Sequence, residues 1–150
     1  MKRPFLTVSL AALLIFVTLA SFIPDSNGLV NDVLDQTNQF RKSKRLPALQ
    51  MNDDLNDIAR KHSENMAKGR VGFGHSGFNQ REKDAKKKID GIHAFAENVL
   101  YGANTGKEAV NLWKNSSGHR RNMLGNYKYI GIGTAKDKQG RIYYTQVFAD

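Results

Sequence analysis

The fold class is decided by two stretches near the C-terminus, Tyr129-Ile130-Gly131-Ile132-Gly133-Thr134 and Arg141-Ile142-Tyr143-Tyr144-Thr145-Gln146-Val147-Phe148. Both are rich in β-branched and aromatic residues, which favour strands. Between them lies Asp137-Lys138-Gln139-Gly140, which has the composition of a turn. The pattern therefore predicts two antiparallel strands joined as a hairpin.

Helical patterns and capping signals dominate the chain before this hairpin. Four helices are expected, over residues 29–41, 52–68, 78–89 and 105–113. Short extended pieces are expected at 48–51 and 94–100, and a polar loop or short turn at 116–125. Helices combined with an antiparallel sheet indicate an α+β fold.

Length and composition limit the possible classes of protein. A chain of 150 residues has room for one domain. Its 40% hydrophobic and 25% charged residues are typical of folded proteins. The sequence contains no cysteine, which excludes disulfide scaffolds, cysteine-based zinc sites, iron–sulfur clusters and thiol nucleophiles.

The N-terminus has the order of a secretory signal peptide. Lys2 and Arg3 precede an apolar run over residues 5–19, and small residues follow. About 20 apolar residues can also span a bilayer, so an uncleaved membrane anchor is the alternative. Residues 1–28 are assigned to this segment and a short linker (24–28), and residues 29–150 to a domain outside the cytoplasm. An exported protein without cysteine suggests a bacterium.

The positive charge belongs mainly to the domain. Removing residues 1–28 lowers the net charge only from +9 to +8, leaving 21 basic and 13 acidic residues. The polar side of the third helix holds Arg81, Lys83, Lys86, Lys87 and Lys88. The run Lys86–Lys88 is either a solvated face or a surface that attracts an anionic membrane or wall polymer. No groove-reading motif or aromatic stacking pattern accompanies the charge, so nucleic acid is not expected.

Two histidines and one carboxylate are candidates for chemistry. His75 and His119 each follow a glycine in an expected loop, and Glu97 lies in an otherwise apolar stretch. A carboxylate in such a stretch must be paired, hydrogen-bonded or shifted in pKa. These groups suit a divalent metal site or an acid/base set. The alternative is structural, with the side chains hydrogen-bonded to loop backbone.

The other two histidines carry weaker signals. His62 lies on the apolar face of the second helix, which favours a hydrogen-bonded core histidine over a ligand. His93 has no neighbouring motif. The sequence also contains no glycine-rich nucleotide loop, nucleophile elbow or His-Glu-x-x-His helix.

The order of these motifs resembles the CAP superfamily, which groups cysteine-rich secretory proteins, antigen 5 and pathogenesis-related class 1 proteins. The likeness covers about residues 29–149 and is nearest to the short, cysteine-free bacterial secreted members. It rests on His75, Glu97-Asn98, Trp113, Ser116-Ser117-Gly118-His119-Arg120-Arg121-Asn122-Met123-Leu124, Ile130-Gly131-Ile132-Gly133 and Tyr144-Thr145-Gln146-Val147-Phe148. Residues 58–67 also resemble the second helix of the family.

The resemblance implies an α-β-α sandwich with a central cleft where two histidines and two acids converge. His75, Glu97 and His119 match three of these positions. The second acid would fall near Ser116, where this sequence has no carboxylate. Ser76 and Asn98 are expected beside the cleft. We do not expect a Ser-His-Glu triad, because neighbouring side chains of an extended loop diverge.

The function that the resemblance favours is an exported, non-enzymatic binding module for a small ligand, lipid, glycan or peptide. His75, His119 and Glu97 are expected to hold a divalent metal such as zinc with modest affinity. One alternative is a secreted hydrolase, with Glu97 as base or a metal that activates water. The other is an envelope protein that acts through its basic helix.

Overall fold

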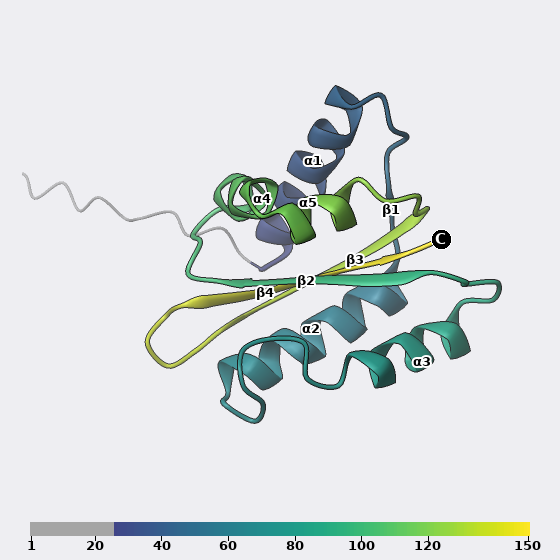
Figure 1. Cartoon of the computed structure of the whole chain (residues 1–150). Coiled ribbons are helices and arrows are strands. Elements are labelled where there is room, and N and C mark those ends of the chain that lie inside the picture. Colours follow the sequence, from purple (N-terminus) through teal and green to yellow (C-terminus); the bar gives the residue numbers. More distant parts are fainter. Residues whose placement is uncertain (1–25) are drawn as a thin grey trace, which may run out of the picture.

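The structure is a computed structural model that describes residues 26–150 (Figure 1). Its elements are α1 (Ser26–Ser43), β1 (Gln50–Met51), α2 (Asp53–Ala67), α3 (Phe78–Lys88), β2 (Phe95–Tyr101), α4 (Gly106–Asn115), α5 (Ser117–Met123), β3 (Tyr129–Lys136) and β4 (Ile142–Ala149). The expected signal segment and the first two residues of the linker lie outside the described residues. Within the described range, none of the helices has both the length and the apolar character that crossing a bilayer requires.

A four-stranded sheet with the order β1-β3-β4-β2 forms the middle of the domain. The hairpin prediction is confirmed: β3 and β4 pair antiparallel, with Ile130 opposite Phe148 and Thr134 opposite Tyr144. β2 pairs antiparallel with the other side of β4. The two-residue β1 runs parallel to β3, so the sheet is mixed rather than wholly antiparallel.

Helices cover both faces of the sheet (Figure 1). One layer holds α1, α4 and α5, and the other holds α2 and α3. This is the expected α-β-α sandwich. Each layer has its own apolar cluster, one around Trp113 and the other around Leu55. Trp113 is fully buried, meets the edge of Tyr144 and donates its indole N–H to Val99 O.

Two glycines of β3 set how closely α2 approaches the sheet. A Cβ on Gly131 would collide with the Leu55 backbone, and a Cβ on Gly133 with the backbone of Ala59 and Arg60. These contacts are with backbone atoms, which side-chain rotation cannot relieve. The Ile-Gly-Ile-Gly pattern therefore keeps α2, and with it His62, close against the strands.

Two predicted boundaries are wrong. The expected linker at 24–28 is helical from Ser26 onward, since the first turn of a helix tolerates residues such as Asn27 and Gly28. Residues 117–123, expected as a loop or turn, form α5. Its sequence has weak helix formers and no side-chain cap, so local rules miss it. Contacts from the rest of the fold hold this helix instead, because Met123 is fully buried and Asn122 bonds to β2.

Candidate functional site

The buried carboxylate of Glu97 is the centre of the candidate site. It extends from β2 and its side chain is fully buried. Arg81 Nε donates to Glu97 Oε2 at 2.6 Å, and Arg81 Nη2 donates to Oε1 at 2.8 Å. His75 Nδ1 lies 2.9 Å from the same Oε1. Both carboxylate oxygens are therefore occupied by partners from this chain, as a buried charge requires.

Arg81 connects this carboxylate to the loop before α3. Gly77 has φ 80° and turns the chain into the helix, which places Arg81 one turn later above β2. The same guanidinium donates to Ser76 O at 2.8 Å and to His75 O at 3.4 Å. Only 12% of the Arg81 side chain is exposed. Arg81 was expected only to lie on the polar side of the helix, and the structure shows that its charge is used inside the site.

His75 is the exposed member of the site. Its side chain is 51% exposed, in the loop between α2 and α3. A carboxylate only accepts hydrogen bonds, so Nδ1 is the donor toward Glu97. The neutral ring then carries its lone pair on Nε2. This ring nitrogen is a hydrogen-bond acceptor or a metal ligand for a molecule that enters the cleft.

His62 is hydrogen-bonded to the backbone of the same loop. It is 3% exposed on α2, and its Nε2 lies 2.8 Å from Gly74 O and 4.0 Å from Glu97 Oε1. Burial lowers the pKa of His62, so the neutral ring is favoured. The prediction of a hydrogen-bonded core histidine is confirmed. Its position beside Glu97 was not expected, since no local pattern links the two residues.

His119 comes from α5, in the helical layer on the other face of the sheet. Burial lowers its pKa, and the charge of His75 lowers it further. The convergence of His75 and His119 on one site stays a prediction, which rests on the motif order of the CAP superfamily.

Asn98 has a structural place in the cleft wall. It is fully buried, and its amide donates to His119 O and Gln146 Oε1. Asn122 donates in turn to Asn98 Oδ1 at 2.9 Å. These bonds hold the start and end of α5 against β2. Asn98 therefore positions His119 through its backbone, while Ser76 contributes its carbonyl to Arg81.

The expected second acid is absent from this site, and the described residues place Arg81 and His62 beside Glu97 instead. Within residues 26–150 no group of three His, Cys, Asp or Glu side chains is arranged to hold a metal ion. As the side chains stand, Glu97 does not fit the role of metal ligand, because Arg81 and His75 already occupy its oxygens. Two imidazoles remain for any metal.

An exposed aromatic group lies at the end of β2, beside the loop that carries His75. Phe73, two residues before His75, and Tyr101, at the end of β2, are 52% and 46% exposed. Their rings meet edge to face with centroids 4.8 Å apart. Tyr143 stacks on the other side of Tyr101 at 5.6 Å. We call Phe73, Tyr101 and Tyr143 the aromatic platform.

The fold and the site define the class of protein. It is a small α-β-α sandwich domain in which two histidines, His62 and His75, lie beside a buried glutamate. Residues 34–148 match the family model described as CAP, the cysteine-rich secretory protein family. The chain therefore belongs to the CAP family, which confirms the resemblance seen in the sequence.

Bacterial proteins are among its relatives. The chain is 35% identical over 104 residues to the uncharacterized protein YkwD of Bacillus subtilis, a match that covers 67% of this chain and 40% of YkwD. It is 31% identical over 121 residues to the uncharacterized membrane protein YlbC of the same organism, covering 77% and 33%. The chain thus spans two fifths or less of the length of these relatives.

Solved structures show the same fold. An extracellular protein containing an SCP domain from Bacillus anthracis superposes with a TM-score of 0.71 at 28% identity, covering 83% of this chain and 41% of that one. A cysteine-rich secretory protein from Staphylococcus aureus gives 0.67 at 26% identity, covering 85% and 40%. The protein is a CAP domain of the bacterial type.

Proposed function

We propose that this CAP domain is a non-enzymatic binding module that holds a glycan in the cleft formed by His75, His119 and the aromatic platform. The observation that carries the proposal is the occupied Glu97 carboxylate. A general base must lie within hydrogen-bond reach of the proton that it removes. With both oxygens held by Arg81 and His75, Glu97 is suited to orienting a loop rather than to hydrolysis.

Exposed aromatic rings favour a glycan over the other ligands considered. Phe73 and Tyr101 are two of the three large apolar side chains exposed in the described residues, and they lie together. Their area is too small for a stable protein interface, which needs about 800 Å² on each partner. It suits the apolar face of a sugar ring. Imidazole nitrogens and tyrosine hydroxyls nearby supply hydrogen bonds for sugar hydroxyls.

Export to the cell surface or medium remains part of the proposal. It rests on two observations. In residues 1–20, basic residues are followed by an apolar run and then by small residues. One of the similar solved structures is an extracellular protein. One relative is named a membrane protein. The alternative is therefore a domain that faces outward and stays attached to the membrane by an uncleaved N-terminal segment.

Zinc binding by His75 and His119 also stays a prediction. The affinity expected is low, because Arg81 competes for the third ligand, Glu97. Glu97 instead orients the His75 ring by accepting a hydrogen bond from Nδ1. Carboxylates commonly fix the tautomer and orientation of metal-binding histidines in this way.

Titration with N-acetylglucosamine oligosaccharides tests the proposed function. We expect chemical shift changes in NMR spectra at Phe73, His75 and Tyr101, and an unchanged oligosaccharide by mass spectrometry afterwards. Phe73→Ala should weaken binding, whereas Leu112→Ala, which removes an equally exposed apolar side chain from α4, should not. Cleaved oligosaccharide would reject the non-enzymatic function, and equal binding by both variants would reject the aromatic platform.

A further inference from the structure

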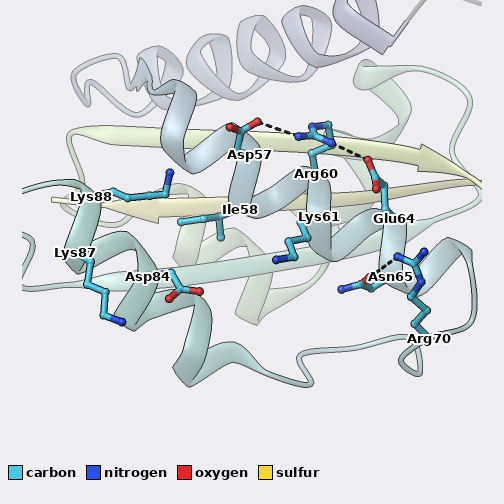
Figure 2. Close-up of a pocket in the computed structure, with 10 residues that line it drawn as sticks. All are labelled: Asp57, Ile58, Arg60, Lys61, Glu64, Asn65, Arg70, Asp84, Lys87 and Lys88. Atoms are coloured by element: carbon cyan, nitrogen blue, oxygen red, sulfur yellow. Dashed lines mark hydrogen bonds and ion pairs between the residues drawn. The ribbon is translucent and has the colours of Figure 1, made fainter.

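A concave surface lies between α2 and α3. This groove has a volume of about 670 Å³. Residues from α2, from α3 and from the loop between them line it (Figure 2). A smaller cavity of about 260 Å³ continues it toward His62 and Arg81. The two cavities share the lining residues Ile58, Lys61, Asn65 and Asp84.

Three cations in the groove have no acidic partner. Lys61 extends from α2, Arg70 from the loop that follows it, and Lys87 from α3. Within residues 26–150, neither lysine makes an ion pair, and Arg70 donates to the neutral amide of Asn65. In the view of Figure 2, Lys61 lies between Arg70 at one end and Lys87 at the other. Together they form a row of three unneutralised charges.

The other charges of the groove largely cancel. Arg60 pairs with both Asp57 and Glu64. Lys88 is paired with Asp54, just outside the lining. Asp84 accepts a hydrogen bond from Gln80, and among residues 26–150 no cation approaches it closely enough for an ion pair. One free carboxylate thus opposes three free cations, and the groove keeps an excess of positive charge.

Ion pairs neutralise part of the basic run that the sequence places on α3. Lys86 pairs with Glu82, and Lys88 with Asp54, so two of its three consecutive lysines are already neutralised. Lys87 is the member that remains, and it faces the groove. A flat anionic membrane would meet an outward face of the helix, whereas a linear anionic chain can lie between the two helices.

We propose that the groove between α2 and α3 binds a linear phosphodiester polymer, with Lys61, Arg70 and Lys87 each contacting a phosphate. Ile58 supplies an apolar wall for the linker between phosphates. None of these three cations contacts Glu97 or His75, so this proposal and the proposed function can fail separately. Contacts of this kind release counterions, and affinity falls with rising salt.

Binding of synthetic poly(glycerol phosphate), measured by calorimetry over a series of salt concentrations, is the test. The triple variant Lys61→Gln, Arg70→Gln, Lys87→Gln should lose about tenfold to a hundredfold in affinity, the sum expected for three exposed charge contacts. Its affinity should also become nearly independent of salt. Asp84→Asn should strengthen binding severalfold, because it removes the opposing carboxylate.

A matched control variant distinguishes the effect of the groove cations on binding from the effect of net charge. The variant Lys44→Gln, Lys107→Gln, Lys138→Gln removes the same charge from three exposed positions, which lie just after α1, on α4 and in the hairpin turn. This variant and His75→Ala should both bind the polymer like the wild type. Equal losses in the two triple variants would overturn the proposal. So would groove-dependent binding to phosphatidylglycerol vesicles without binding to the soluble polymer, since that result would assign the site to a membrane.

Discussion

Replacing Arg81 by methionine removes the cation that neutralises Glu97. The carboxylate is fully buried and would keep one histidine contact and no guanidinium. Breaking a buried ion pair by removing one partner costs about 3–5 kcal/mol. The Arg81 side chain is 12% exposed, so water can partly solvate the carboxylate once the guanidinium is gone. We therefore expect a loss of stability at the lower end of this range, about 3 kcal/mol. The lost bonds to Ser76 O and His75 O act in the same direction.

Urea denaturation followed by the fluorescence of Trp113, the single tryptophan, measures this free energy of unfolding. Lys68→Met is the control, because it breaks an exposed pair with Glu64 and should change stability by less than about 1 kcal/mol. The double variant Arg81→Met, Glu97→Leu should recover most of the loss, since it leaves no unpaired charge. A loss in Arg81→Met no larger than in Lys68→Met would refute the reasoning.

Four further predictions concern the core, pH, metal and export. Trp113→Ala should cost about 3–5 kcal/mol, as for other buried large aromatics, and an unchanged urea midpoint would contradict the packing around it. Because the pKa of His62 is lowered by burial, the unfolded state binds more protons below its ordinary value of about 6.5. Stability should therefore fall as pH falls below about 6.5, and less steeply in His62→Gln; parallel pH profiles would contradict this. Calorimetric zinc titration should show weak binding that decreases below about pH 6 and is abolished in His75→Ala and His119→Ala; equal binding in all three proteins would exclude a shared site. N-terminal sequencing of protein from the medium should find residues 1–20 removed, and an intact Met1 on membrane-bound protein would indicate an anchor instead.

The hairpin and most helices follow from local sequence rules. The β3–β4 pairing needs only strand-forming residues on either side of a turn, and the Thr105 cap with Glu108 is a contact between near neighbours. α5 could not be found this way, since it is held by Asn122 and Met123 through contacts with distant parts of the chain.

The candidate site was predictable in part. The apolar setting of Glu97 correctly required a partner, but nothing local distinguishes Arg81 from the solvated lysines of the same helix. The pair lies 16 residues apart across a loop, and only the left-handed Gly77 turn brings Arg81 over β2. His62 was correctly placed in the core, although its nearness to Glu97 depends on how closely α2 approaches β3.

The central claim is that Arg81, rather than a metal ion, neutralises Glu97 in the cleft. A crystal structure of the protein grown at about pH 7.5 with excess zinc tests it most directly. We predict that Arg81 keeps its hydrogen bonds to both oxygens of Glu97 and that any zinc is bound by His75 and His119 alone. Zinc bound to Glu97, with the Arg81 side chain turned toward solvent, would contradict the account.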